Sequence, residues 1–284
     1  ADVVSAPAFR PHEVDAEREV ILEEILMSED DPDDVVGQAL SVALFPDHPL
    51  GRDTLGTVDT VTALGRDEIA AFHAERYRPS TLVVAAAGAV DHDEVVAQVA
   101  ASFGEAPAAA AVERAAPSAS PLPLEVLERP TEQVHLALGW RGIDAFDDDR
   151  YALAVANQIL GGGVASRLFQ EVREERGLAY SVYSSPALYA DAGTFTICSG
   201  TGPSRLAALL AVIDEVLEDF LANGPTDEEM EVAIGYLVGS TELGLEDSAS
   251  RMGRLGGSEV VRGEVLPVDV QLDRIRAVAA DDVQ

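Results

Sequence analysis

The feature that most constrains this chain is a weak internal repeat. A shift of 214 residues takes Pro11 to Pro225, Glu17 to Glu231 and Asp33 to Asp247. The same shift relates Val20 to Ile234, and Asp67-Glu68-Ile69 to Asp281-Asp282-Val283. Because the predicted order of helices is also the same around both copies, we expect two homologous domains in one chain.

The repeat also predicts which parts of each copy are present. With the shift of 214 residues, the counterpart of residues 71–103 would lie at 285–317, beyond Gln284. The counterpart of residues 132–204 would lie before Ala1. We therefore expect both domains to be incomplete here, with about 90 residues missing upstream.

Local patterns predict a mixed α+β fold. Helices are expected at 12–29, 31–45, 67–77, 91–103, 148–160, 164–176, 203–222, 226–243, 246–262 and from 268 onward. Strands are expected at 81–90, 132–140, 180–185 and 194–199. An alanine- and proline-rich stretch without periodicity, residues 104–124, predicts a linker between domains at 1–103 and 125–284.

The charge of the chain limits the classes of partner that it can bind. The net charge is −32, and all 19 basic residues are arginine. This balance argues against a nucleic-acid partner, because phosphate contacts need clustered basic residues. No apolar run is long enough to span a bilayer. Two interpretations of the acidity stay open: a solvated surface from a salt-adapted or GC-rich genome, or an acidic chamber that selects basic peptides.

The single cysteine, Cys198, excludes a disulfide within the chain. A chain without a cysteine pair favours a reducing compartment, so we expect a cytoplasmic location.

Two glutamates on one predicted helix form the first candidate site. At about 100° per residue, positions seven apart return to nearly the same bearing, so Glu17 and Glu24 share a stripe flanked by Val20 and Ile21. Glu23 falls on the opposite, solvent-facing side. A carboxylate on an apolar face needs a metal, a cation or hydrogen bonds, so we expect this pair to be buried and partnered.

Four segments follow one another along the chain: Glu17-Arg-Glu-Val-Ile-Leu-Glu-Glu-Ile25, His48-Pro-Leu-Gly-Arg52, Tyr77-Arg-Pro-Ser-Thr-Leu-Val-Val84 and Ser166-Arg-Leu-Phe-Gln-Glu-Val-Arg-Glu-Glu-Arg-Gly-Leu-Ala-Tyr-Ser-Val182. In this order they resemble the pitrilysin and insulysin family of zinc peptidases, and most closely its mitochondrial-processing-peptidase-like branch. The resemblance implies a duplicated fold in which each domain is a mostly antiparallel sheet covered by helices.

The resemblance also implies a zinc site. In these inverzincins, Zn²⁺ is held by the two histidines of H-x-x-E-H and by a glutamate about 75 residues later. Glu24 matches that third ligand and Glu17 an acidic residue beside it. The chain lacks H-x-x-E-H: its closest histidines, His73 and His92, are 19 residues apart. Counting back from Glu24 places the motif in the expected upstream segment.

A second pair implied by the resemblance is Arg173 and Tyr180, which would bind the substrate backbone and the developing oxyanion. The spacing supports convergence, because Arg173 leaves the last turn of a helix, Gly177 turns the chain and Tyr180 opens a strand. The glycines at 161–163 are not a phosphate-binding loop. We interpret them as a flexible helix break, with a substrate-contacting loop as the alternative. His48 and Arg52 are interpreted as loop-capping residues.

Three function classes follow. The first is a zinc-dependent endopeptidase, of which this chain is a fragment, that cleaves peptides or unfolded polypeptides by a metal-activated water. The second is a non-catalytic partner subunit of a processing-peptidase-like complex, and the third is an unrelated acidic binding protein. Because one chain supplies Glu17, Glu24, Arg173 and Tyr180, we expect the first class, working as a homodimer without a specialised partner.

Overall fold

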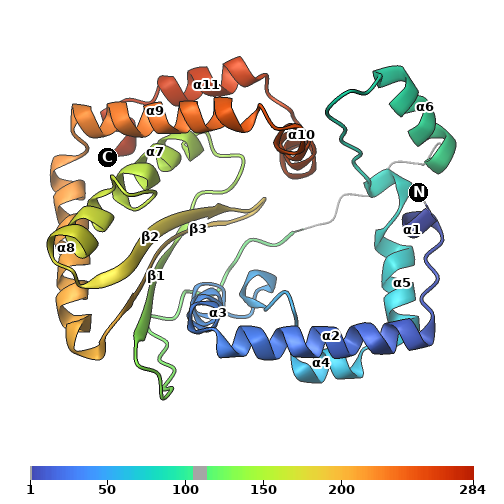
Figure 1. Ribbon diagram of the computed structural model, residues 1–284, viewed down its shortest axis with the longest axis horizontal. Helices are drawn as coiled ribbons and strands as arrows, with labels where there is room; N and C mark the ends of the chain where they lie inside the picture. The colour runs from blue at the N-terminus through green and yellow to red at the C-terminus, as the bar shows by residue number, and fades with distance from the viewer. Residues whose placement is uncertain (1, 105–113) are drawn as a thin grey trace.

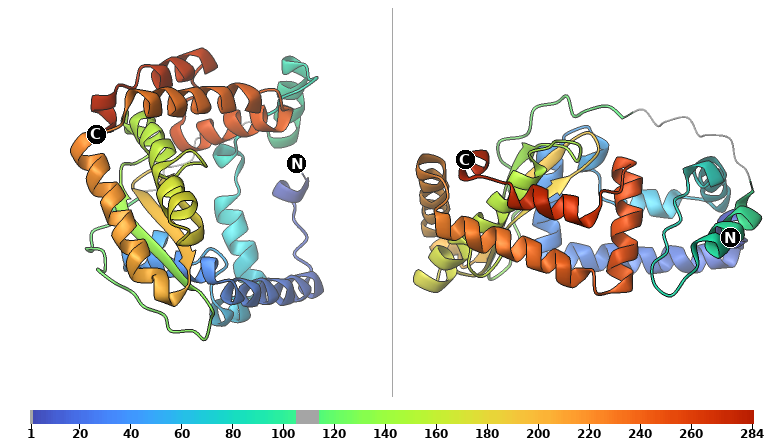
Figure 2. Two further views of the ribbon diagram at one scale, coloured as in Figure 1. Left: turned by 60° about the vertical axis from the view of Figure 1, so that its left-hand side comes forward. Right: turned by 90° about the horizontal axis from the view of Figure 1, so that it is seen from above.

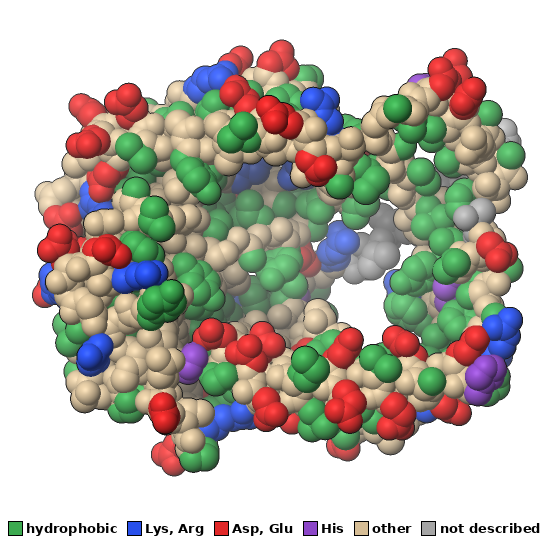
Figure 3. Space-filling view, viewed as in Figure 1, with side chains coloured by type: hydrophobic (Ala, Val, Ile, Leu, Met, Phe, Trp, Pro, Cys, Tyr) green, Lys and Arg blue, Asp and Glu red, His purple; other side chains and the backbone are tan. Residues whose placement is uncertain are grey.

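The computed structural model describes residues 2–104 and 114–284, which surround a central opening (Figures 1 and 3). The first half is helical. Its elements are α1 (Asp2–Ser5), α2 (Pro11–Asp30), α3 (Pro32–Leu44), η1 (Pro49–Gly51), α4 (Val58–Ala63), α5 (Arg66–Arg76), η2 (Pro79–Thr81) and α6 (His92–Phe103). Local caps fix the starts: the Asp31 and Asp91 side chains accept hydrogen bonds from the N–H groups of Asp33 and Glu94, at 2.9 and 3.0 Å.

The second half contains the sheet and its covering helices. Its elements are β1 (Val134–Gly142), α7 (Arg150–Leu160), the π-helix η3 (Phe169–Glu175), β2 (Ala179–Leu188), β3 (Gly193–Thr201), η4 (Pro203–Arg205), α8 (Leu206–Asn223), α9 (Asp227–Gly244), α10 (Ser248–Arg262), α11 (Val268–Arg276) and α12 (Ala280–Val283). The strands are antiparallel in the order β1-β3-β2. This arrangement confirms the predicted α+β class.

The main core lies between one face of this sheet and helices α7, α8 and α9. Val155 of α7, Ile197 of β3 and Leu209 and Ile213 of α8 are 0–1% exposed. The amphipathic pattern of α7 puts Val155 and Ile159 on one stripe, so the helix seals against the sheet. These contacts make the second half the better-packed part of the molecule.

The internal repeat is visible in the helices. A shift of 214 residues moves α2 to 225–244 and α3 to 246–258, close to α9 and α10 as the structure has them. In Figure 1, α2 and α9 lie along opposite sides of the central opening, and the left view of Figure 2 shows the same separation.

The two halves contact each other on both sides of the opening. On one side α3 packs on β1: Gly139 leaves room for Leu40 and Leu44, since a Cβ there would come within 3.0 Å of both. The His135 Nδ1 and Asp33 Oδ1 atoms lie 2.6 Å apart. On the other side Ala85 meets α10 at Gly256, where an added Cβ would lie 3.2 Å from the Ala85 Cβ.

The strand predicted at 81–90 was wrong. Residues 82–87 have no regular secondary structure and join no strand ladder among the described residues, and Ala85 lies instead against Gly256 of α10. An apolar run forms a strand only when a neighbouring strand is available to pair with it. The helix predicted at 164–176 begins at Arg167, and most of it is a π-helix.

Two further predictions concern the linker and the membrane. Residues 105–113 of the predicted linker lie outside the described residues, so the domain boundary stays a prediction. None of the described helices combines the length and the apolar character needed to cross a bilayer.

Candidate functional site

Arg173 and Tyr180 lie side by side, as their spacing predicted. The guanidinium carbon of Arg173 is 4.4 Å from the centroid of the Tyr180 ring. The chain reverses between η3 and β2 at Gly177, whose φ of 56° favours glycine. The Leu178 N–H closes the reversal by donating to the Val172 carbonyl at 2.8 Å. Since Val172 is fully buried, the core anchors the turn that connects the two residues.

A second ring contacts Arg173. Phe169 lies four residues earlier in η3, and the Arg173 guanidinium carbon is 4.8 Å from its ring centroid. Phe169 is half-buried, whereas Tyr180 is 79% exposed. The sequence analysis did not single out Phe169. The pattern Phe-x-x-x-Arg could have indicated it, because residues four apart on a helix are neighbours.

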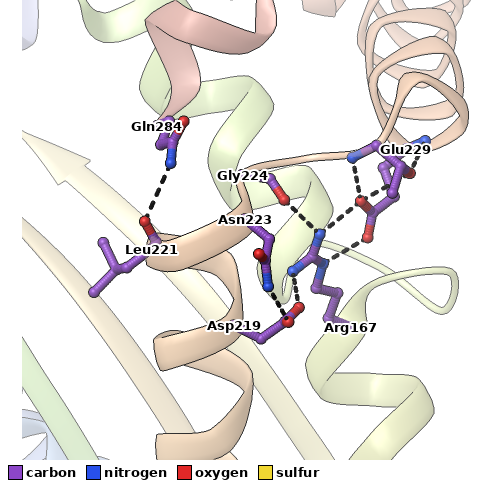
Figure 4. Close-up of polar contacts among 8 residues, drawn as sticks. Arg167, Asp219, Leu221, Asn223, Gly224, Glu229 and Gln284 are labelled. Atoms are coloured by element: carbon purple, nitrogen blue, oxygen red, sulfur yellow. Dashed lines mark hydrogen bonds and ion pairs between the residues drawn. The ribbon is translucent and has the colours of Figure 1, made fainter.

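Arg167, just before η3, and Arg173, within η3, make different kinds of contact. Arg167 donates to Glu229 through Nε and Nη2 at 2.6 and 2.8 Å, to Asp219 at 2.9 Å and to the Gly224 carbonyl at 2.9 Å (Figure 4). In the described chain Arg173 donates no hydrogen bond; its nearest carboxylate is Glu174, 3.6 Å from Nε. Arg167 therefore ties elements together, while Arg173 keeps its N–H groups for another acceptor.

The electrostatics of the Arg167 cluster follow from these contacts. The hydrogen bond to Glu229 raises the pKa of Arg167 above its ordinary value, and the same bond lowers the pKa of the Glu229 carboxyl. A paired, half-buried arginine of this kind stabilises the junction of η3, α8 and α9. It is a structural residue that sequence reasoning did not single out.

The expected burial of Glu17 and Glu24 was wrong. Both side chains are exposed on α2, as is Glu23, and Val20 beside them is 50% exposed. Glu17 and Glu24 do share one side of the helix, but among the described residues α2 packs mainly on α3 and α4. Of its apolar residues only Ile25 is buried. Glu17 lies at the rim of a groove of 360 Å³ that it shares with Phe9, Ile21 and other residues of α2, α4 and α5.

The structure brings neither glutamate to the Arg173–Tyr180 pair. α2 borders one side of the central opening and the sheet another (Figure 1). Among the residues the structure describes, no three His, Cys, Asp or Glu side chains are grouped so that they could hold a metal ion. The described residues thus do not fit a complete zinc site, and Glu24 offers a single carboxylate.

Two other predicted loop features have local explanations. His48 caps η1, because its Nδ1 accepts from the Leu50 N–H at 3.2 Å, which confirms the capping prediction. Gly161 does break the helix, but it is pressed against β2: an added Cβ would lie 2.5 Å from the Ser184 backbone nitrogen. Its carbonyl accepts from that nitrogen at 3.1 Å, so this glycine is needed for close approach.

Comparison with known proteins decides the family. Residues 63–237 match the family model described as the peptidase M16 inactive domain. This chain belongs to peptidase family M16. Residues 1–58 match a second M16 model, described as insulinase, so Glu17 and Glu24 fall in one M16 segment and Arg173 and Tyr180 in the other.

Relatives within family M16 agree. The chain is 46% identical to an uncharacterized zinc protease of Streptomyces coelicolor, over 100% of this chain and 63% of that protein. It is 36% identical to the uncharacterized zinc protease YmxG of Bacillus subtilis, over 100% of this chain and 69% of that protein. The crystal structure of a peptidase M16 inactive domain from Pseudomonas fluorescens superposes with a TM-score of 0.82 at 29% identity, covering 99% of this chain and 68% of that one. The chain thus spans about two thirds of the length of these M16 relatives.

Proposed function

We propose that this chain is the substrate-side part of a zinc-dependent endopeptidase of family M16 that acts on peptides and unfolded polypeptides. The proposal depends on one observation: the Arg173 guanidinium contacts two aromatic rings, and its N–H groups donate no hydrogen bond within the described structure. A guanidinium whose N–H groups are unpaired can donate them to a carbonyl oxygen or an oxyanion.

The chemistry open to these residues is donation of hydrogen bonds. Arg173 would donate from its guanidinium edge and the exposed Tyr180 from its hydroxyl, so that both bind the carbonyl oxygen of a scissile or neighbouring peptide bond. Donors already in position stabilise charge that develops on that oxygen during hydrolysis. Arg173 and Tyr180 would thus act as catalytic and substrate-binding residues together.

The zinc side is proposed on family membership. Glu24 would be one ligand of Zn²⁺ and Glu17 an acidic residue near the metal, with the other ligands supplied from outside the described residues. When bound, zinc would supply Lewis-acid activation of water.

The position of β2 favours an extended substrate. β2 is an outer strand in the order β1-β3-β2, so one of its edges faces no other strand of this sheet. A peptide can pair with such an edge through its backbone, whatever its side chains. Tyr180 lies at the start of β2, so a peptide on this edge would pass the Arg173–Tyr180 pair.

Variants of the full-length protein that carries this chain test the proposal. Arg173→Ala and Tyr180→Phe should each lower kcat for an unfolded basic peptide by about 10²-fold, the loss expected for one oxyanion donor, while bound zinc stays unchanged. Glu24→Gln should abolish both stoichiometric zinc and activity, and Glu23→Gln, the matched exposed control on α2, should affect neither. Equal loss of zinc in Glu23→Gln and Glu24→Gln would contradict the assignment of Glu24.

A second candidate function is a non-catalytic partner subunit. Two observations favour it: the matched model over residues 63–237 is described as inactive, and Glu17 and Glu24 are exposed without a partner among the described residues. A full-length protein that binds no zinc, and that raises the activity of a second family member, would establish this alternative.

We also propose that the full-length protein works alone as a homodimer, because one chain carries both the zinc-side and the substrate-side residues. The test is expression without any partner, followed by light scattering and peptide cleavage. A protein that binds zinc but cleaves only after a second family member is added would instead indicate a heterodimer.

A further inference from the structure

We propose that Phe169 is a positioning residue for Arg173: its ring fixes the guanidinium on Tyr180 so that the unused N–H edge meets a peptide carbonyl. This inference rests on the proposed function of Arg173. It adds a residue from one turn earlier in η3, which sequence reasoning did not include.

The first argument is that Arg173 has few polar contacts that could fix its side chain. Its side chain is 34% exposed, and the only carboxylate within 4 Å in the described chain is the adjacent, exposed Glu174. A long side chain with one weak ion pair would sample many rotamers. Contacts at 4.8 Å to Phe169 and 4.4 Å to Tyr180 supply the restraint instead.

The second argument is the asymmetry of the two rings. Tyr180 is 79% exposed, so its ring is itself poorly restrained by neighbours. Phe169 is half-buried and lies between Leu168 and the core residue Val172, which are both fully buried. Phe169 is therefore the less exposed of the two rings, on a turn that Leu168 and Val172 anchor to the core, and it restrains Arg173 and through it Tyr180.

The third argument is the type of interaction. A hydrogen bond or a bidentate ion pair would also fix an arginine, as it does for Arg167, but it would occupy the N–H groups. The face of an aromatic ring has no nitrogen or oxygen acceptor, so ring contacts restrain the guanidinium without pairing its N–H groups. A positioning residue for a donor arginine should therefore be aromatic, as Phe169 is.

The test uses the full-length protein and four variants. Phe169→Leu keeps an apolar side chain but removes the ring; we expect kcat for an unfolded peptide to fall about tenfold with zinc content unchanged. Phe169→Tyr keeps the ring and should retain most of the activity. In an Arg173→Ala background, Phe169→Leu should cause no further loss, because the residue acts through Arg173.

Two results would overturn the inference. One is an equal loss from Phe169→Leu in the presence and in the absence of Arg173, which would indicate a general structural effect. The other is independent of activity: the Nε–Hε resonance of Arg173, assigned with Arg173→Lys, should shift in Phe169→Leu, and an unmoved resonance means that the ring does not contact the guanidinium. A wild-type protein that cleaves no peptide refutes the proposed function, while this resonance still decides the contact.

Discussion

At the scale of single residues, the segment around η3 separates two uses of arginine. Arg167 donates its N–H groups to Glu229, to Asp219 and to the Gly224 carbonyl, and its side chain is 15% exposed. Arg173 contacts rings and keeps its N–H groups available. The first arrangement stabilises the fold and the second suits ligand binding. Substitutions of Arg167 should therefore change the stability of the protein, and substitutions of Arg173 its activity.

Removing Arg167 should lower stability. Arg167→Ala leaves Glu229 partly buried without its partner, and we expect the free energy of unfolding to fall by about 2 kcal/mol. Arg10→Ala is the matched control, because the Arg10–Glu13 pair is well exposed and should matter by less than about 0.5 kcal/mol. Urea denaturation measures both. Similar losses in the two variants would mean that the Arg167 cluster adds little.

The Glu229 carboxyl predicts a pH dependence. Its pKa is lowered in the folded state by the hydrogen bond to Arg167, so the unfolded chain binds more protons as the pH falls. The stabilisation is complete above the ordinary value of 4.5 and is lost as the pH drops below it through the folded-state pKa. Glu229→Gln should show a shallower loss of stability with acid over this range. If stability fell with pH equally steeply in Glu229→Gln, Glu229 would not be the source of this pH dependence.

At the scale of elements, the sequence predicted what depends on neighbours in the chain. Caps such as Asp31 and Asp91, and the φ of Gly177, are local signals, and the helices and the turn they predict are present. The strand at 81–90 and the burial of Glu17 and Glu24 depend on which surfaces come together. Sequence periodicity carries no information on such partners, so those two predictions were wrong.

The contact between α10 and residues 82–87 can be tested with two glycines. Gly256→Leu places a side chain against Ala85, where even a Cβ lies at 3.2 Å, whereas Gly257→Leu meets nothing within 4 Å. The change in helix propensity is the same, so the difference reports the contact. We expect Gly256→Leu to cost about 1–3 kcal/mol of local stability, seen as faster hydrogen exchange at residues 82–90. Equal exchange in both variants would mean that the contact does not form.

At the scale of the whole molecule, charge and shape act together. Helix α2 carries eight acidic residues in twenty and borders the central opening, and Figure 3 shows acidic side chains along its length. The net charge of −32 without a single lysine makes repulsion between exposed carboxylates a general cost of folding. The two interpretations of this acidity, salt adaptation and selection of basic peptides, both predict sensitivity to salt.

Salt should raise the thermal stability. Going from about 0.1 M to about 1 M NaCl shortens the Debye length from about 10 Å to about 3 Å, and we expect Tm to rise by about 2–6 °C. KCl at equal ionic strength should act alike. The rise should be smaller in the variant Glu19→Gln/Glu23→Gln, which removes a like-charged pair one turn apart on α2. A Tm that falls or stays constant with salt would contradict the argument from repulsion.

The π-helix η3 has a consequence for how this segment tolerates change. A π-turn holds one residue more than an α-turn, so deleting one residue between Phe169 and Arg173 would let the segment relax to an α-helix. The turn would then lose its extra residue, so the side chains before and after the deletion would keep nearly the faces that they have now. An inserted residue has no such outlet, because the turn already holds one residue more than an α-turn. The segment from Phe169 to Arg173 should therefore accept the loss of one residue more readily than the gain of one.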